Sequence, residues 1–478
     1  MKPARLDDTG KRLLFWIVVA APSVAIALLA GAAAVEAQTS GPPPYKLIRH
    51  EEDRSDLKDP SRRSEWLDRL KYIPLSESRE GWFLTVAGEA RERFEFFRNT
   101  NWDAANGADG FLLQRYMLSG DLHLGRRVRA FSQLKSGLED GREGGPRGTD
   151  EDRLDLHEAF VDVRLGSGKP ATLRVGRQEV AFGSQRLVSV RAGPNVRQSF
   201  DGIAVIVGPG AWRLDTFALK PVETETGVFD DDPDHARTFW GLYAVGPLGL
   251  IRAANVDLYY LGLDRKRASF DQGTASELRE SVGVRVWRRT APWDYNFELV
   301  YQWGRFGSAP IRAWTVASDT GLTLRDTLWR PRIGLKADVT SGDKDPDDPR
   351  LQSFNALFPR GAYFGENQLL GPVNHIDLHP SMDINPFWSV TVSASWLFFW
   401  RQSLRDGLYG VPGNLIRSGE GTSARYVGSQ PELLATAAVG RHVTLGAAFE
   451  YFLAGPFLRE SGPADDVTFL ATWVGFVF

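Results

Sequence analysis

Apolar and polar residues alternate with a period of two from Trp82 to the end of the chain. Near residue 297, for example, Phe297 and Leu299 flank the polar Glu298. Successive side chains of a β-strand point to opposite faces, so this period predicts strands with one apolar and one polar face. The pattern recurs in the segments 84–96, 116–124, 128–135, 159–165, 282–286, 295–303, 333–340 and 390–398. The chain is therefore predicted to be all-β.

A soluble β-sandwich and a transmembrane β-barrel both show this alternation. The final segment, with Leu470, Val474 and the terminal Phe478, is apolar on one face and stops on an aromatic residue, as expected of the strand that closes an outer-membrane barrel. Charged residues such as Arg91 and Arg93 occupy the polar face. A barrel would direct them into a water-filled lumen and the apolar face toward lipid. Both features favour the barrel.

Links between the predicted strands are alternately short and long, as in outer-membrane barrels with short periplasmic turns and long extracellular loops. This alternation predicts an antiparallel up-and-down transmembrane barrel of about 18 strands. Short links are predicted at 125–127, 166–170, 208–211, 246–249, 289–293, 319–327, 384–387 and 440–442. Long links are predicted at 99–110, 139–152, 178–199, 221–235, 264–277, 342–375, 402–431 and 455–466, with 305–310 as the one short link on that side.

The first 81 residues differ from the rest. A basic leader, an apolar run at 13–35 and the small-residue site Val35-Glu36-Ala37 predict a cleaved signal peptide over 1–37. The run is long enough for an uncleaved transmembrane anchor, but Pro22 and the basic leader favour the signal peptide. Residues 38–81 are predicted to be a periplasmic segment, with a short helix near Trp66 or loosely ordered, and residues 82–478 the barrel.

Composition excludes several other classes. Apart from the leader, no long apolar run exists, which excludes a helical membrane bundle. The 15 Trp, 28 Phe and 12 Tyr fit aromatic girdles at two membrane interfaces. With no Cys, disulfides and thiolate metal sites are excluded. A net charge of -3 argues against a nucleic-acid partner.

Several motifs stand at separate places along the chain. They are GEARERFE at 88–95, LHEAFVD at 156–162, VGRQE at 175–179, GSQRLV at 183–188, GPNVRQSFDG at 193–202, FPRGAYFGE at 358–366 and GPVN at 371–374. From about residue 70 to the end, the chain resembles the alginate export family of outer-membrane barrels. The resemblance implies an eighteen-stranded barrel whose arginine-rich constriction passes a polyanionic polysaccharide outward. The family's long, late periplasmic turn is replaced here by the short link 440–442, which argues against plugging by that turn and against strict specificity for alginate.

Candidate lumen residues follow from the chemistry of such a polymer. A uronate chain carries a carboxylate on every sugar, and Arg stays charged and pairs bidentately with carboxylates. Rings of Arg and Lys select anions in pores. Alternation places these residues on the lumen face: Arg91, Arg93, Arg115, Arg129, Lys135, Arg174, Arg285, Arg332 and Lys336. The motif at 175–179 adds Arg177, and the link at 178–199 adds Gln185, Arg186, Arg191, Asn195 and Arg197.

The link at 178–199 has a further property. Leu187, Val188 and Val190 make it too apolar for a solvated loop, so it is predicted to fold into the lumen and narrow it. The alternative for any one arginine is a structural pair with a wall carboxylate, such as Glu89 or Asp162. For the whole set, anion conduction is favoured.

Two other kinds of site have candidate residues in the sequence, a calcium site and a hydrolase site. The acidic runs at 230–234 and 343–348 offer oxygen ligands for Ca²⁺, but neither has EF-hand spacing, so solvated loops are favoured. A barrel hydrolase would need a nucleophile, a histidine and a carboxylate near one rim. Ser119, Asp121 and His123 alternate on one strand without forming a triad pattern. No catalytic residue, metal or cofactor is predicted.

The sequence therefore predicts a passive, anion-preferring pore in the outer membrane of a Gram-negative cell, which exports an acidic polysaccharide such as alginate. The alternatives are a general porin for uptake of small anions or acidic oligosaccharides and, from another class, the hydrolase. Expected partners are membrane lipid, lipopolysaccharide and the anionic polysaccharide. The strand ending at Phe478 is expected to engage the barrel-assembly machinery, and a periplasmic export scaffold is a further candidate. The protein is expected to be a monomer.

Overall fold

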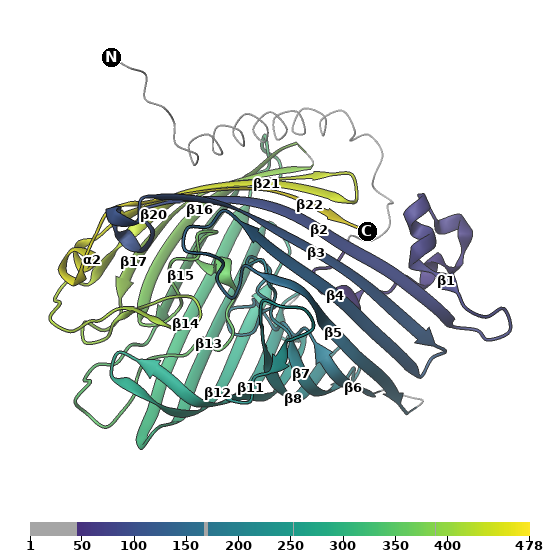
Figure 1. The fold of residues 1–478 in the computed structure, drawn as a ribbon, viewed down its shortest axis with the longest axis horizontal. Helices are drawn as coiled ribbons and strands as arrows, with labels where there is room; N and C mark the ends of the chain where they lie inside the picture. Colours follow the sequence, from purple (N-terminus) through teal and green to yellow (C-terminus); the bar gives the residue numbers. More distant parts are fainter. Residues whose placement is uncertain (1–44, 167–170, 252, 388) are drawn as a thin grey trace, which may run out of the picture.

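A closed antiparallel β-barrel forms most of the protein (Figure 1). The computed structural model describes residues 45–166, 171–251, 253–387 and 389–478, so the predicted signal peptide lies outside the described residues. Each wall strand pairs with the next one along the chain, and the first, β2, pairs with the last, β22. The sheet has 20 strands, of which β1 and β9 are two-residue pieces outside the wall. The described wall therefore has eighteen strands, as predicted.

The wall strands span most of the described chain. The first nine are β2 (Trp82–Arg98), β3 (Ala108–Leu124), β4 (Val128–Asp140), β5 (Asp152–Leu165), β6 (Ala171–Gln178), β7 (Phe200–Val207), β8 (Arg213–Glu223), β10 (Arg237–Pro247) and β11 (Asn255–Phe270). The other nine are β12 (Gly273–Arg288), β13 (Trp293–Phe306), β14 (Ala309–Thr323), β15 (Arg332–Thr340), β16 (His375–Phe387), β17 (Val390–Arg401), β20 (Tyr426–Val439), β21 (Val443–Ala454) and β22 (Val467–Val477).

Short elements lie outside the wall. The strands are β1 (Ile73–Pro74), β9 (Asp232–Pro233), β18 (Leu408–Tyr409) and β19 (Leu415–Arg417), and the α-helix is α2 (Pro456–Ser461). The 3₁₀ helices are η1 (Arg49–Glu51), η2 (Ser55–Lys58), η3 (Pro60–Arg62), η4 (Trp66–Lys71), η5 (Thr100–Trp102), η6 (Ala104–Asn106) and η7 (Gly361–Tyr363). Among the described residues, no helix has the length and apolar character needed to cross a membrane.

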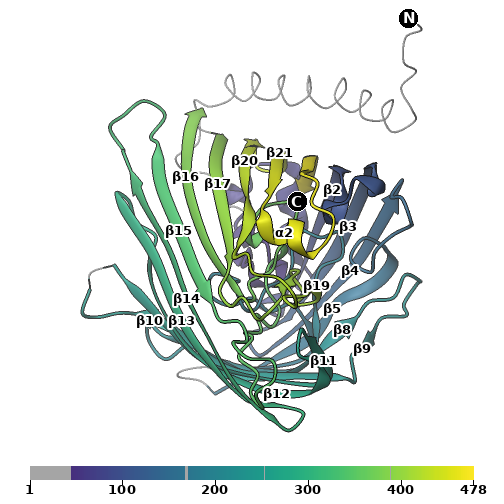
Figure 2. The same cartoon turned by 90° about the vertical axis from the view of Figure 1, so that its left-hand side faces the viewer.

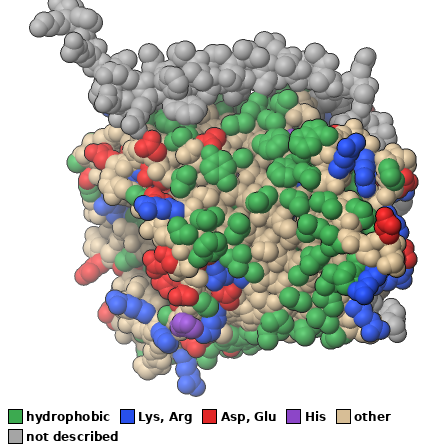
Figure 3. Space-filling view, turned by 45° about the vertical axis from the view of Figure 1, so that its right-hand side comes forward, with side chains coloured by type: hydrophobic (Ala, Val, Ile, Leu, Met, Phe, Trp, Pro, Cys, Tyr) green, Lys and Arg blue, Asp and Glu red, His purple; other side chains and the backbone are tan. Residues whose placement is uncertain are grey.

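The orientation of side chains on the wall matches the prediction. Leu299 and Leu335 point outward and are 51% and 45% exposed, whereas Arg285 and Glu298 point inward and are 3% and 6% exposed. Figure 3 shows the result on one face, where hydrophobic side chains form a broad field between charged margins. Such an apolar band is what lipid requires of a barrel's outer surface.

The two ends of the barrel differ as expected, with one correction. Most links at one end, here called the turn end, are short, and those at the other, the loop end, are longer. The predicted long link at 264–277 is wrong: β11 and β12 continue through it and leave only residues 271–272 between them. This segment pairs across the two strands from Arg265 with Glu277 to Phe270 with Gly273, despite its polar composition. Within the described residues, the loop end therefore has two tight hairpins, since β13 and β14 are also joined by only two residues.

The N-terminal segment, here residues 45–74, packs against the turn end of the barrel (purple in Figure 1). It contains short 3₁₀ helices in place of an α-helix. β22 pairs with β2 only from Glu89 onward, and β1 pairs with the earlier part of β2 that β22 leaves open. The segment also reaches the closing strand, because Arg49 donates a hydrogen bond of 2.5 Å to the Phe478 carbonyl. It therefore covers the seam at which the barrel closes.

Candidate functional site

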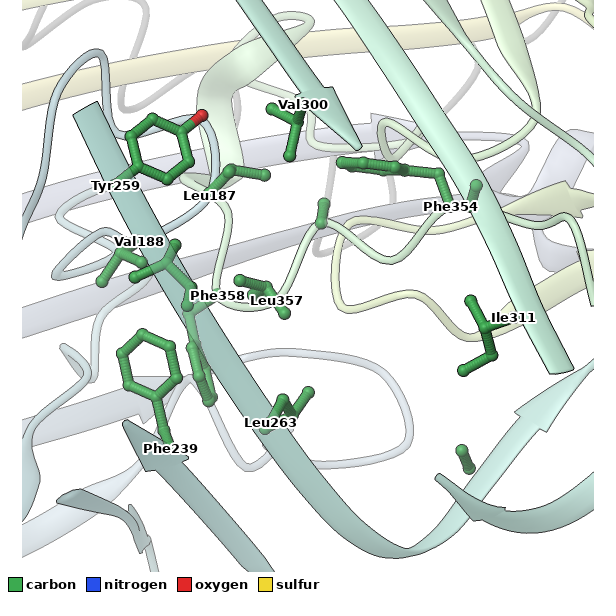
Figure 4. Packing of buried hydrophobic residues seen from close by; sticks show 14 of the residues in the cluster. Leu187, Val188, Phe239, Tyr259, Leu263, Val300, Ile311, Phe354, Leu357 and Phe358 are labelled. Carbon is green, nitrogen blue, oxygen red and sulfur yellow. The ribbon is translucent and has the colours of Figure 1, made fainter. Parts of the chain in front are cut away.

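Two long links enter the lumen and pack against each other. The inner loop (179–199) joins β6 to β7, and the late loop (341–374) joins β15 to β16. They meet where Val188 and Phe358 form a parallel bridge, with the Ser189 amide donating to the Phe358 carbonyl at 2.9 Å. Both loops contribute to one hydrophobic cluster with the wall, part of which Figure 4 shows. The prediction that residues 178–199 fold inward agrees with this packing, whereas the inward course of the late loop was not predicted.

A second hydrophobic cluster occupies the lumen near the loop end. It joins Phe399 and Phe452 of the wall to Phe457 and Leu458 of α2 and to Trp102 of η5. In Figure 2, α2 and the segment around β19 lie across this end of the barrel. At this end the inner face of the wall is apolar, because loops pack against it and exclude water. The predicted polar lumen face is therefore found only along part of each strand.

Asn195 anchors the inner loop to the wall. Its side-chain amide nitrogen lies 2.9, 3.0 and 2.8 Å from the carbonyl oxygens of Gln114, Leu138 and Asp150. Arg91 and Arg115 hold the same part of the loop, donating to carbonyls within residues 192–194 at 3.0–3.1 Å. These three predicted binding residues are thus engaged in positioning the loop.

The cations of the inner loop are buried to different degrees and differently paired. Arg186 donates to Thr315 and Thr340 at 2.6 and 3.1 Å, and Arg197 pairs with Glu179 at 2.6 Å. Burial alone would lower the pKa of Arg197, but the carboxylates of Glu179 and Glu89 outweigh it and raise that pKa. Arg191 has no carboxylate partner among the described residues, and burial lowers its pKa to about 10.

Most predicted wall cations form ion pairs with wall carboxylates. The pairs are Arg93 with Glu95 and Glu366 (2.6 and 2.9 Å), Arg115 with Glu89 (2.6 Å), Arg129 with Asp121 (2.7 Å), Arg174 with Asp162 (2.8 Å), Arg177 with Asp201 (3.0 Å), Arg285 with Asp257 (2.8 Å) and Arg332 with Asp294 (2.6 Å). Each individual arginine therefore matches the structural alternative stated for it. All of them nevertheless lie on the lumen side of the wall.

Two predicted wall cations differ: Arg91 donates to loop carbonyls, and Lys336 lines a cavity. Among the described residues Lys336 has no ion-pair partner, and its ammonium donates to the Tyr363 carbonyl at 2.7 Å. It lines a lumen cavity of about 270 Å³ together with Arg360, an exposed residue of the late loop. Gln185 precedes Arg186 beside this cavity, and the Gln185 carbonyl accepts the Arg360 amide. The cavity lining is mixed in charge: Arg186, Lys336 and Arg360 face Glu298, Asp319, Asp338, Glu366 and Glu432.

A larger cavity, here called the mouth cavity, opens at the turn end. It has a volume of about 1040 Å³ and lies between the N-terminal segment and the inner wall from β2 to β8. Eight Lys and Arg side chains line it, against five Asp and Glu. The cations are Lys46, Lys58, Arg126, Arg127, Arg129, Arg164, Arg174 and Arg213, and the carboxylates are Glu51, Glu52, Asp53, Glu80 and Asp162. Alternation predicted Arg129 and Arg174, but the rest lie in turns, strand ends or the N-terminal segment.

His50 connects the N-terminal segment to the wall of this cavity. Its Nδ1 lies 2.7 Å from Glu158 Oε1, and its Nε2 lies 2.7 Å from Nη1 of Arg174. Because a guanidinium only donates, Nε2 accepts and Nδ1 carries the proton, so the ring is neutral. Burial, followed by the charge of Arg174, lowers the pKa of His50 well below its usual value. A neutral imidazole therefore fixes the segment in place.

Some carboxylates of the two acidic runs are buried and have partners within the protein. Lys135 lies 2.6 Å from Asp152 and 2.7 Å from Asp231, so an ammonium already stands among Asp152, Asp155 and Asp231. In the other run, Asp343 accepts backbone amides of Asp345 and Gln352. A second group of possible metal ligands in the described chain is Asp338, His375 and Asp377, where His375 contacts Asp377 at 3.1 Å.

The candidate hydrolase residues make contacts within the wall. The Ser119 hydroxyl donates to the Ala87 carbonyl at 3.3 Å, and His123 stacks on Phe83 and contacts Asp121 at 3.1 Å. His157 is fully buried and lies 2.8 Å from Glu179. These contacts position the side chains in the wall and at its mouth.

The fold and lumen define a porin-like outer-membrane β-barrel, and comparison with solved structures agrees with this class. Acinetobacter baumannii OccAB2 is 11% identical, with a TM-score of 0.56 over 82% of this chain and 98% of that chain. Pseudomonas aeruginosa OccK11 (OpdR) is 10% identical, with a TM-score of 0.55 over 85% and 99%. The outer membrane protein opdK from Pseudomonas aeruginosa is 11% identical, with a TM-score of 0.54 over 82% and 98%. At these identities the likeness concerns the fold alone.

The sequence itself is more specific. The family model for alginate export matches residues 83–470, which is most of the chain. The protein therefore belongs to the alginate export family of outer-membrane barrels. A comparison with curated proteins gave no match.

Proposed function

We propose that the protein is a passive, anion-preferring pore that exports an acidic, uronate-rich polysaccharide across the outer membrane. The observation that carries the proposal is the position of the predicted cations, which lie on the lumen wall or in the loop that enters it, in a member of the alginate export family. The cation excess of the mouth cavity supports the same direction of selectivity.

The pairing of the wall arginines is compatible with conduction. A free arginine in a dry lumen would hold a sugar carboxylate tightly, because charge-assisted bonds strengthen away from water. An arginine already paired with a wall carboxylate, such as Arg285 with Asp257, offers an incoming carboxylate only a shared bond. A row of such shared sites would let a polyanion move from one to the next without a deep well.

The second candidate is a porin for uptake of small anions or acidic oligosaccharides. The two hydrophobic clusters favour it, since they occupy part of the lumen, and the cavity at Lys336 has a volume of only about 270 Å³. Export of a polymer would require the inner and late loops to move apart. A small solute would need much less movement.

Block of the channel current by uronate polymers separates the two candidates. For an exporter, we expect long uronate chains to enter and block the current in planar bilayers, and the Lys336→Gln, Arg360→Gln double variant to shorten the block severalfold. Arg405→Gln, at an exposed ion pair with Asp345 in a loop, serves as the control. If only monomers and short oligomers alter the current while long chains never enter, the uptake porin replaces the exporter.

The proposed route to the outer membrane begins with secretion and ends with barrel assembly. A cleaved signal peptide at residues 1–37 would deliver the chain to the periplasm. The last strand, β22, with the Phe478 that follows it, would guide barrel assembly, and lipid and lipopolysaccharide would surround the apolar band. A periplasmic export scaffold would bring the polymer to the turn end of a monomeric barrel.

A further inference from the structure

Three arginines form the outer edge of the mouth cavity. Arg126 and Arg127 occupy the turn between β3 and β4, and Arg164 lies at the end of β5. The end of β5 is joined to the turn between β3 and β4, because the Arg164 amide donates to the Arg127 carbonyl at 2.8 Å. All three side chains are exposed and line the cavity. They are called the rim arginines below.

The rim arginines differ from the cations deeper in the same cavity. Arg129, Arg174 and Arg213 each pair with a carboxylate at 2.7–2.9 Å. The rim side chains make no hydrogen bond or ion pair with any residue in the part of the chain that the structure describes. The inner row therefore has its charge balanced by the wall, whereas the charge of the outer row is available to a ligand.

Their position points the available charge at the opening. Arg164 has the strand parity of Asp162, which lines the lumen, and Arg126 and Arg127 line the same cavity from the turn. Across the cavity, the N-terminal segment adds Lys46 and Lys58. Lys58 pairs with Glu80 at 3.1 Å, but both side chains are largely exposed, so this pair is weak.

The chemistry suits a chain of carboxylates. Guanidinium groups pair bidentately with carboxylates, and several on neighbouring turns can hold successive acidic sugars. A concave mouth with excess positive charge also concentrates anions and raises their association rate. The cavity is lined by turn residues at the turn end and, deeper in the wall, by the buried His50 and Arg174, which contact each other at 2.7 Å. This shape fits the end of a chain arriving from the periplasm better than the flat array of anionic lipid headgroups.

Resting on the proposed function, we propose that Arg126, Arg127 and Arg164 form the first binding site for the incoming uronate chain at the periplasmic mouth. The site captures the chain before it meets the paired arginines of the lumen. It should therefore affect capture from the turn end and leave passage through the lumen unchanged.

Sided block in planar bilayers of neutral lipid tests the proposal with the full chain. Because the sequence has no cysteine, Lys344→Cys in an exposed loop lets an impermeant thiol reagent report which side the loops face. A short uronate oligomer is then added to one side at a time, with a neutral oligosaccharide as reference. The variant Arg126→Gln, Arg127→Gln, Arg164→Gln is compared with Arg267→Gln, Arg305→Gln, Arg312→Gln, which removes three exposed cations near the loop end.

We expect block from the turn end to begin roughly tenfold faster than from the loop end, with the difference shrinking at high salt. The rim variant should abolish that difference without changing the duration of each block, and the control should retain it. Equal rates from both ends in the wild type, or an unchanged difference in the rim variant, would overturn the site. A sided difference that appears only when anionic lipid is added would assign the arginines to lipid instead. The proposed function is rejected if the reversal potential of the wild type shows no preference for anions. The mouth site is judged separately, by the difference between the block rates from the two ends.

Discussion

At the scale of single residues, Lys135 occupies the position that a metal ion would take. It lies among three buried aspartates and contacts Asp152 and Asp231. The sequence favours a solvated loop for the acidic run at 230–234, with a Ca²⁺ site as the alternative. The structure gives a third outcome, in which the charge of the run is partly neutralised by a lysine of the neighbouring wall.

Replacing this lysine should create the cation site that the wild type lacks. Lys135→Ala leaves buried carboxylates without their partner, which typically costs about 3–5 kcal/mol. We expect a lower midpoint of heat unfolding for the variant and partial recovery when Ca²⁺ is added, because Ca²⁺ prefers carboxylate oxygens. Lys344→Ala in an exposed loop is the control. Equal stabilisation of wild type and variant by Ca²⁺ would contradict the assigned role.

The side of the wall on which a residue lies could be read from the sequence, but its partners could not. Alternation along the strand places Arg115 and Arg285 in the lumen, because their apolar neighbours point to the opposite, lipid-facing side. The partners depend on the register between strands: Arg115 meets Glu89 of β2, and Arg285 meets Asp257 of β11. Asn195 shows the same limit, since its three acceptor carbonyls come from separate parts of the chain.

At the scale of elements, the N-terminal segment is held in the mouth by a pH-sensitive contact. His50 faces Glu158, Arg174 and Arg129, and more distant charges are Glu179 and Glu51. The pKa of His50 is well below its usual value while the N-terminal segment is bound in the mouth, and it returns to about 6.5 when the segment is released. The released form therefore binds more protons. The seated form has its full stability above about pH 6.5 and loses about 1.4 kcal/mol per pH unit below it.

Acidification should consequently release the segment. We expect the open probability in planar bilayers to rise as the pH falls below about 6.5, since the segment forms one wall of the mouth cavity. His50→Gln keeps a polar side chain that does not titrate, so its open probability should vary much less with pH. An identical rise in both proteins would show that another group controls the opening.

Prediction from sequence succeeded for strands and failed for some of their connections. Strand positions follow from local alternation, which each segment carries by itself. The inner loop could also be predicted, because Leu187 and Val190 are apolar in a link that would otherwise be solvated. The hairpin between β11 and β12 was missed since its polar residues resemble a loop, although they pair across two strands. The position of the N-terminal segment could not be predicted, because its contacts are with residues that only the assembled barrel brings near it.

At the scale of the whole molecule, the barrel combines a lipid-facing band with a lumen divided along its length. The turn end has a cationic mouth, a lumen cavity has mixed charge, and the loop end is packed with apolar side chains. The preference of the pore for anions or cations then depends on which of these regions interacts most strongly with a permeating ion. The wall arginines and the mouth favour anions, whereas carboxylates such as Glu298 and Glu432 oppose them.

The reversal potential in a planar bilayer of neutral lipid under a potassium chloride gradient tests this balance most directly. The account predicts a preference for chloride at low salt that diminishes at high salt, where exposed charges are screened. A preference for potassium would contradict it, because the wall carboxylates would then dominate the path.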